Sequence, residues 1–167
     1  GTLSWTAQVT HGAGWLSFSA ASSGTNNGPF TVQYGKNETT TTRKGYVKRT
    51  SLSEFQNIRR GGIIALSLEE GDAVVGVALV REGMQVVLVT AKGMAIRFAV
   101  DESVRMMGRQ AYGVNGIRLD AGDRVVDMAM VDETATLLTV CSNGYGKRTS
   151  FEAYLRGGEP QSRGGKG

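Results

Sequence analysis

The chain has 167 residues, a formal net charge of +4, 40% hydrophobic and 20% charged residues, and no apolar run that approaches the length of a membrane helix. Its only cysteine, Cys141, excludes an intrachain disulfide and a cysteine-based zinc site. Its only histidine, His11, leaves almost no material for a histidine metal site or a Ser-His-Asp triad. We therefore expect a globular protein without metal or cofactor and without catalysis of its own.

The first part of the chain, residues 1–43, differs from the rest. It holds both tryptophans and is rich in Thr, Ser, Asn and Gly, and the runs "WTAQV", "WLSFS" and "FTVQY" predict three strands. Trp5, "GAGWLSFS" and "NETTTTRKG" resemble part of a BACON-type module, an immunoglobulin-like β-sandwich. We expect this segment to pack on the next part of the chain or to complete its sheet. The resemblance implies a secreted module, with Trp15 as a core residue or a sugar-stacking residue.

After residue 43 the chain reads as short strands separated by tight turns. The runs "VVGVALV", "QVVLVT", "MAIRFAV", "RVVDMAM" and "ATLLTVC" are rich in β-branched residues and are bounded by glycine or acidic residues. The triplets "AKG" and "SNG" between apolar runs predict hairpin turns in which glycine takes a positive φ. No segment predicts a long amphipathic helix, so the expected class is all-β.

These strands recur with a period of about 50 residues. "GYVKRTSLSEF" starts at Gly45 and "GYGKRTSFEAY" at Gly144, with six of eleven positions identical, and "GMAIRFAVDES" starts between them at Gly93. The starts at 45, 93 and 144 give spacings of 48 and 51. "EGDAVVGVALV" and "AGDRVVDMAMV" repeat at 70 and 121, again 51 apart. Four short strands in about 50 residues is the size of a propeller blade.

Charge alternates with the same period. Residues 43–60, 92–118 and 144–167 have net charges of +5, +3 and +3, whereas residues 61–91 and 119–143 have −3 and −4. Equivalent positions of a periodic fold share a face, so this phasing predicts a basic rim. A basic rim is typical of a protein that binds a polyanion such as DNA, and solvated surface charge is the alternative explanation.

The segments "GYVKRTSLSEF", "SVRMMGRQAYGVNGIRL", "AGDRVV" and "SNGYGKRT" closely resemble the C-terminal domain of the bacterial DNA gyrase A protein, over about residues 44–167. The resemblance implies a partial β-pinwheel, a propeller-like array of four-stranded blades with strand exchange, here of about two and a half repeats. It also implies a cytoplasmic, non-catalytic module of a type II topoisomerase that binds and wraps double-stranded DNA without sequence specificity. No tyrosine here matches the context of the family's cleavage tyrosine.

The end of the chain, "QSRGGKG", is similar to the family's gyrase box, Q-R-R-G-G-K-G, with Ser162 in place of an arginine. We interpret it as a degenerate box. We expect phosphate contacts from the repeated basic positions and from this box. The candidate DNA-binding residues are Lys48, Arg49, Arg59, Arg60, Arg97, Arg105, Arg109, Lys147, Arg148, Arg163 and Lys166. The box comprises Gln161, Ser162, Arg163, Gly164, Gly165, Lys166 and Gly167.

Two other interpretations remain open at this stage. Because the two resemblances imply different compartments, the chain can be a chimera of a sandwich fragment and a pinwheel fragment with no biochemical activity. Alternatively, residues 1–43 carry a carbohydrate-binding surface. In either case, an incomplete ring leaves open blade edges through which copies of the chain can self-associate.

Overall fold

The computed structural model describes residues 29–34, 43–57 and 62–167. The strands are β1 (Pro29–Tyr34), β2 (Arg43–Ser51), β3 (Val74–Leu79), β4 (Gln85–Thr90), β5 (Ala95–Ala99), β6 (Val114–Leu119), β7 (Val125–Met130), β8 (Thr136–Val140) and β9 (Gly146–Ser150). In this part of the chain the helical elements are one turn long: η1 (Leu52–Phe55), α1 (Val100–Ser103) and η2 (Phe151–Tyr154). The expected all-β class is confirmed.

The one-turn helices mark the repeat. η1, α1 and η2 begin at residues 52, 100 and 151, which is seven residues after each repeat start at 45, 93 and 144. Each directly follows the second strand of a hairpin: β2, β5 or β9. The turns before β5 and β9 contain Gly93 and Gly144 with φ of 84° and 86°, so the predicted glycine hairpin turns are confirmed.

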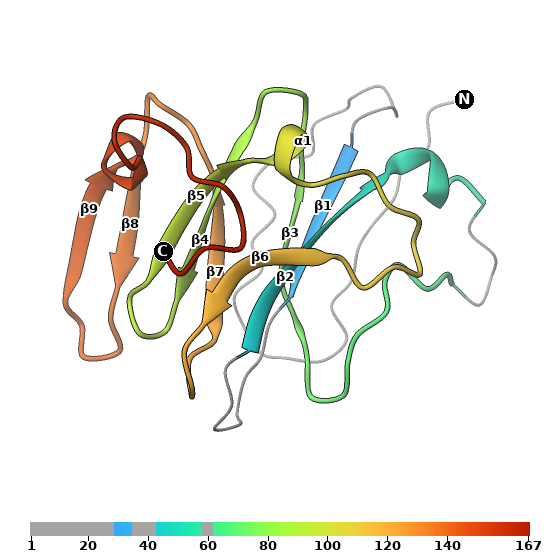
Figure 1. The fold of residues 1–167 in the computed structure, drawn as a ribbon, viewed down its shortest axis with the longest axis horizontal. Helices are drawn as coiled ribbons and strands as arrows, with labels where there is room; N and C mark the ends of the chain where they lie inside the picture. Colours follow the sequence, from blue (N-terminus) through green and yellow to red (C-terminus); the bar gives the residue numbers. More distant parts are fainter. Residues whose placement is uncertain (1–28, 35–42, 58–61) are drawn as a thin grey trace.

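The strands form three antiparallel sheets, which we call blades 1, 2 and 3 (Figure 1). Blade 1 has the order β3-β1-β2-β6, blade 2 has β5-β4-β7, and blade 3 is the β8-β9 hairpin. β6 follows β5 in the chain but pairs with β2, with Arg43 opposite Leu119 and Val47 opposite Val114. A strand from one repeat thus completes the sheet of the repeat before it, as a strand-exchanged blade requires.

A strand from the N-terminal segment belongs to blade 1. β1 pairs along its whole length with β2, from Pro29 opposite Ser51 to Tyr34 opposite Tyr46, and with β3 on its other edge. The expectation that residues 1–43 complete the first blade is met by this strand, the predicted "FTVQY". The other two predicted strands of the segment and Trp15 lie outside the described residues, and the division at residue 43 stays a prediction.

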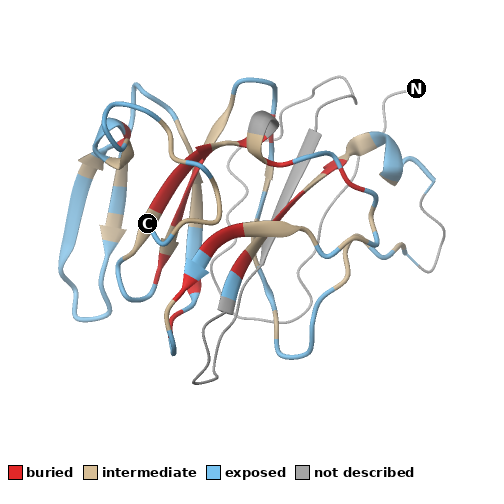
Figure 2. Cartoon of the chain, in the orientation of Figure 1, coloured by how far each residue is buried: buried red, intermediate tan, exposed pale blue. Residues whose placement is uncertain are grey.

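The core lies around blade 2. Val86, Val87 and Leu88 on β4 and Ile96 and Phe98 on β5 are at most 1% exposed, so consecutive residues are buried on both faces of the sheet. The burial colouring in Figure 2 shows this band along β4 and β5, continuing into β2 and β6. Both faces are buried because blade 2 lies between blade 1 and blade 3, which is typical of stacked sheets.

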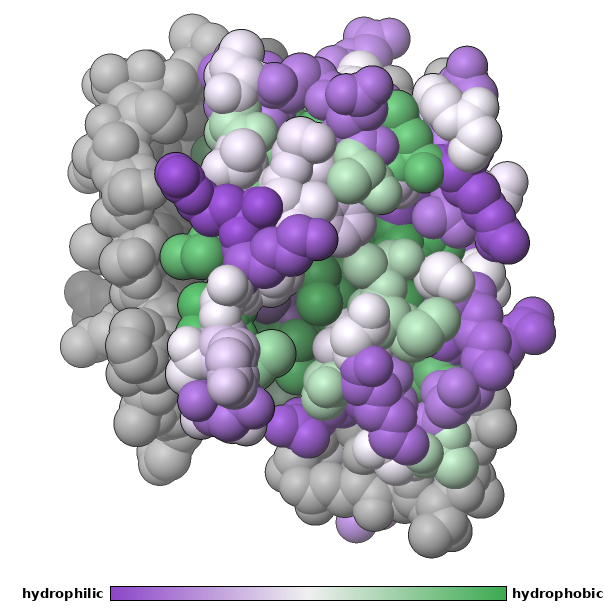
Figure 3. Space-filling model, turned by 90° about the vertical axis from the view of Figure 1, so that its left-hand side faces the viewer, coloured by the Kyte–Doolittle hydropathy of each residue, from purple (hydrophilic) through white to green (hydrophobic). Residues whose placement is uncertain are grey.

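Blade 3 is covered much less. The residues of β8 alternate between exposed and half-buried, and those of β9 are mostly exposed. Leu138 and Val140 on β8 are 60% and 66% exposed. Figure 3, which looks at the molecule from this side, shows hydrophobic groups in the middle of the face with hydrophilic groups around them. The two-stranded blade 3 therefore has apolar surface that the described residues do not cover.

Gly45 lets blades 1 and 2 approach each other. A Cβ at Gly45 would lie 2.5 Å from Val125 Cγ2 and 2.8 Å from Ile117 Cγ2. Both neighbours are buried and β-branched, so they have little freedom to move away. We expect Gly45→Ala to lower the free energy of unfolding by about 1–3 kcal/mol, the usual effect of overpacking a core.

The matched control is Gly108→Ala, because nothing lies within 4 Å of a Cβ at that position. Urea denaturation of the two variants and the parent chain checks the prediction. Equal midpoints for Gly45→Ala and Gly108→Ala would show that the approach of the two blades at this point is loose.

Candidate nucleic-acid interface

Arg97 on β5 is a buried cation that joins blades 2 and 3. Its side chain is 2% exposed, and its guanidinium donates to Gln85 Oε1 at 2.7 Å and to the Phe151 carbonyl at 2.8 Å. It also forms a salt bridge with Glu133, in the connection between β7 and β8. The planar guanidinium thus donates to acceptors on three segments, so Arg97 joins blade 2 to blade 3 and does not face solvent.

Lys48 on β2 is also buried. Its ammonium donates to the carbonyl of Ala65 at 3.2 Å and to the carbonyl of Arg109. Burial lowers the pKa of Lys48 from its ordinary value of 10.5, and the nearby Arg109 charge lowers it further. A phosphate contact requires an exposed side chain, and Lys48 and Arg97 are both buried. The expectation that these two cations face solvent is therefore wrong.

The cause is visible in the repeat. Arg49, Arg97 and Arg148 each lie four residues after a repeat start and each is paired with the first strand of a hairpin, opposite Thr31, Val87 and Leu138. Arg49 is half-buried, Arg97 is buried and Arg148 is exposed. At this position of the repeat the arginine is therefore buried where another part of the chain covers the strand. On blade 3, which is covered least, Arg148 and the neighbouring Lys147 are exposed.

The other predicted residues are dispersed. Arg105 is exposed, and Arg109 is half-buried with its Nη1 donating to the Ile64 carbonyl at 2.8 Å. Arg59 and Arg60 lie outside the described residues. A shallow pocket of about 300 Å³ is lined by both Arg109 and Glu54, so a basic and an acidic residue share it.

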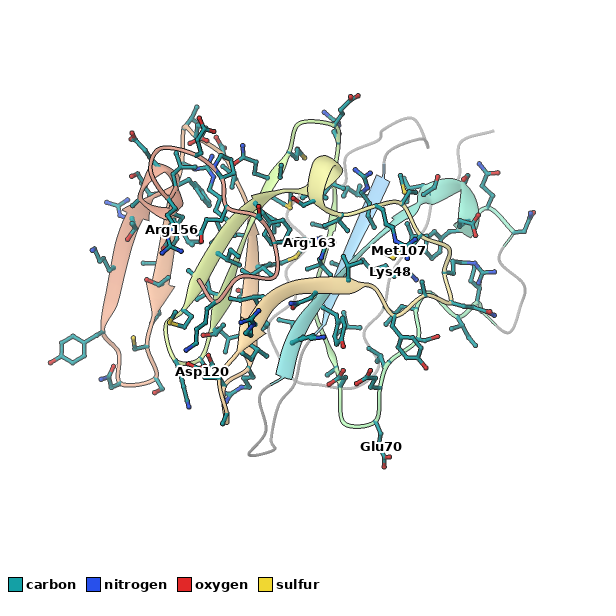
Figure 4. The ribbon with its side chains drawn as sticks, in the orientation of Figure 1. Lys48, Glu70, Met107, Asp120, Arg156 and Arg163 are labelled. Carbon is teal, nitrogen blue, oxygen red and sulfur yellow. The ribbon has the colours of Figure 1, made fainter. Side chains whose placement is uncertain are left out.

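The predicted box, Gln161–Gly167, runs between β5 and β6. Gln161 N donates to the Arg97 carbonyl at 2.8 Å, Gly164 N to the Gly116 carbonyl at 2.6 Å, and Arg118 N to the Gly165 carbonyl at 2.7 Å. The segment therefore joins blades 1 and 2 through its backbone. Arg163 points inward, with Nη1 donating to the Asn115 carbonyl at 3.0 Å and Nε donating to the Ser103 carbonyl (Figure 4). Among the cations of the box, only Lys166 is largely exposed.

The glycines of the box repeat a feature of the preceding blade. Residues 110–116 read "QAYGVNG" and residues 161–167 read "QSRGGKG", 51 positions apart, with glycine at the fourth and seventh places of both. A Cβ at Gly116 would lie 2.7 Å from Val47 Cγ1, and a Cβ at Gly167 would lie 2.8 Å from the Ala95 carbonyl. The box lies against β5 as residues 110–116 lie against β2, so its glycines permit close backbone packing.

Five exposed cations gather where β6 ends, and we call them the basic cluster. Its members are Lys44, Lys92, Arg118, Arg124 and Lys166. They come from β2, from the β4–β5 turn, from β6, from the β6–β7 turn and from the box. Of these five, only Lys166 was among the predicted site residues.

Hydrogen bonds hold these five residues in one region. Lys44 is opposite Arg118 in the β2–β6 ladder. Lys92 Nζ donates to the Ala121 carbonyl at 2.7 Å, and Ala91 N donates to the Arg124 carbonyl at 2.9 Å. Lys166 follows the box residue that accepts from Arg118 N. Segments from all three sequence repeats therefore contribute to the basic cluster.

Two carboxylates lie within the basic cluster and have different surroundings. Asp123 is 1% exposed, and its Oδ1 accepts from Lys92 N at 3.0 Å and from Arg124 N at 2.8 Å, so it fixes the turn that carries both cations. Asp120 is 49% exposed and forms a salt bridge of 3.0 Å with Lys166. Asp120 is labelled in Figure 4 near the end of β6.

The described residues contain no group of three or more His, Cys, Asp or Glu side chains that could hold a metal ion. Among the same residues, no helix has the length and apolar character needed to cross a membrane. Cys141 is exposed in the turn after β8.

The fold and the basic cluster define a propeller-type protein made of strand-exchanged blades. The sequence matches the family described as DNA gyrase C-terminal domain, beta-propeller, over residues 40–81, 85–132 and 135–167. The chain belongs to this family.

Relatives and solved structures agree with this membership. The DNA gyrase A protein of Haloquadratum walsbyi is 47% identical over 131 residues, and that of Mycobacterium tuberculosis is 44% identical over 127 residues. These matches cover 77% and 75% of the chain and 15% of each relative, so the chain spans about a seventh of their length. A solved structure of the DNA gyrase A C-terminal domain aligns with a TM-score of 0.69 and 28% identity, covering 87% of this chain and 44% of that one. The C-terminal domain of DNA topoisomerase IV aligns with a TM-score of 0.70 and 26% identity, covering 86% of this chain and 41% of that one.

The interpretation of Arg97 as a link between blades gives a stability prediction. Arg97→Met keeps most of the side-chain volume but leaves Gln85 Oε1 and the Phe151 carbonyl without their donor. We expect a loss of about 1–3 kcal/mol in the free energy of unfolding. Arg148→Met, at the equivalent exposed position of blade 3, should change it by no more than about 0.5 kcal/mol. Guanidinium denaturation of both variants checks this, and equal losses would contradict the inter-blade role of Arg97.

The buried Lys48 gives a prediction about pH. Its folded pKa lies below the unfolded value of 10.5, so between the two values the unfolded chain binds more protons and stability rises with pH. Lys48→Met removes this contribution. The free energy of unfolding of the parent chain minus that of Lys48→Met should therefore increase as the pH is raised towards 10.5. Tyr46, whose pKa is raised chiefly by burial, titrates in both proteins and cancels. Urea denaturation near neutral pH and at high pH measures the difference, and a difference that falls with pH would show that Lys48 is not desolvated.

Proposed function

We propose that this chain is a non-catalytic module that binds double-stranded DNA through its phosphate backbone, and that the basic cluster is its principal contact surface. The observation that carries the proposal is the convergence of five exposed cations from three repeats at the end of β6. Family membership supports the same conclusion, because the relatives are named as parts of DNA gyrase. A cytoplasmic location is part of this proposal.

The chemistry of the basic cluster suits a phosphate backbone better than it suits bases. Lysine and arginine side chains on turns reach into solvent, and each phosphate contact releases a condensed counterion. The cluster contains neither an exposed aromatic residue nor a long element that could enter a groove. The expected binding is therefore independent of DNA sequence and strongly dependent on salt.

Exposed cations elsewhere can extend the path of the DNA. Lys147 and Arg148 lie on blade 3, the blade that follows in the chain, and both are exposed. A duplex that contacts both surfaces has to bend around the array, and a smooth bend costs a few kcal/mol for a site of ~20–30 base pairs. Wrapping in this form requires contacts on more than one blade.

Removing charge from the basic cluster tests the proposal. The double variant Lys44→Gln, Arg118→Gln should bind a duplex of about 30 base pairs more weakly than the parent chain, in fluorescence anisotropy titrations at two salt concentrations. The slope of log K against log salt should become less steep by about 1.8, because two phosphate contacts each contribute about 0.9. The affinity loss should be the same for duplexes of unrelated sequence.

The matched control is the double variant Arg81→Gln, Arg156→Gln, which makes the same change of net charge at exposed residues outside the basic cluster. It should retain the parent affinity and the parent slope within error. Equal losses in the two double variants would assign binding to net charge alone. Absence of binding by the parent chain even at low salt would overturn the proposed function.

A further inference from the structure

One cation of the basic cluster, Lys166, is paired with a carboxylate, Asp120. Asp120 Oδ1 lies 3.0 Å from Lys166 Nζ, which is within the usual range for an ammonium that contacts a phosphate oxygen. Both side chains are about half exposed, at 49% and 57%. The second carboxylate of the region, Asp123, is buried and bonded to backbone N–H groups, so it cannot exchange partners in this way.

The fold brings Asp120 and Lys166 together. Asp120 directly follows β6, and Lys166 directly follows Gly165, whose carbonyl accepts from Arg118 N at 2.7 Å. This backbone bond holds the end of the box beside the end of β6. An exposed ion pair is worth at most about 1 kcal/mol, so it can be opened at little cost when a phosphate approaches.

We propose that Asp120 is an intramolecular competitor of DNA phosphate for Lys166. In the free protein the Asp120 carboxylate pairs with the Lys166 ammonium. When DNA binds, a phosphate oxygen takes the place of the carboxylate. The exchange lowers the affinity of the basic cluster for DNA and makes release easier. This inference rests on the proposed function, since it concerns the regulation of the same surface.

The test compares Asp120→Asn with Glu70→Gln. Both variants lose one negative charge, and Glu70 lies in the turn before β3, well away from Asp120 in Figure 4. We expect Asp120→Asn to bind a duplex of about 30 base pairs about five-fold more tightly than the parent chain, and its salt slope to steepen by about 0.9 as Lys166 gains a phosphate contact. Glu70→Gln should change the affinity by less than about two-fold, because a charge beyond a Debye length is screened.

A double-mutant cycle separates competition for Lys166 from simple repulsion of DNA by Asp120. If Asp120 acts through Lys166, the gain from Asp120→Asn should largely disappear in a Lys166→Gln background, and so should the change in salt slope. A gain of the same size in both backgrounds would overturn the inference and leave plain repulsion. Thermal unfolding of each variant shows whether all of them are folded at the temperature of the titrations.

The possible failures are distinct. If the parent chain binds DNA and Lys44→Gln, Arg118→Gln weakens it, but Asp120→Asn behaves like Glu70→Gln, the competitor role is wrong and the proposed function stands. If neither the parent chain nor Asp120→Asn binds DNA at low salt, both are wrong.

Discussion

The exchange of β6 between repeats determines how the rest of this molecule is arranged. A strand leaves its backbone N–H and C=O groups unpaired along any free edge, and those groups must find partners. β6 belongs to the second repeat but satisfies the edge of β2 in the first, so the two repeats cannot separate without breaking a sheet. The box then lies beside β6 and bonds to it and to β5, which joins blade 1 to blade 2 a second time.

This arrangement divides the basic residues into two groups. A cation on a strand that another part of the chain covers has to find backbone or side-chain acceptors, because burying an unpaired charge is costly. Arg97 and Lys48 do this with carbonyl groups and with Gln85 and Glu133. A cation in a turn or close to the end of a strand faces solvent, as Lys92, Arg124 and Lys44 do. Buried, structural cations and solvent-facing cations therefore occur along the same chain and within the same repeats.

The box shows the same division within seven residues. Its glycines allow the backbone to lie against β5 and β6, and Arg163 bonds to two carbonyls, so most of the motif holds blades together. Lys166 is the part that reaches solvent, and there it meets Asp120. The motif therefore positions one solvent-facing cation beside the end of β6, where a carboxylate partly neutralises it.

Periodicity, class and family could all be predicted from the order of the residues. Three features depend on local patterns that the sequence displays directly: the positions where the repeats start, the strands and the glycine turns. The repeats start at Gly45, Gly93 and Gly144. The sequence could not predict which cations face solvent. Arg97 and Arg148 occupy equivalent positions of the repeat, but Arg97 is covered by another blade and Arg148 is not.

The basic cluster was missed for a related reason. Lys44, Lys92 and Arg118 are far apart in sequence. They meet only because β6 crosses to β2 and the β4–β5 turn contacts the β6–β7 turn. Tertiary contacts between blades therefore determine which cations are exposed and which of them lie together.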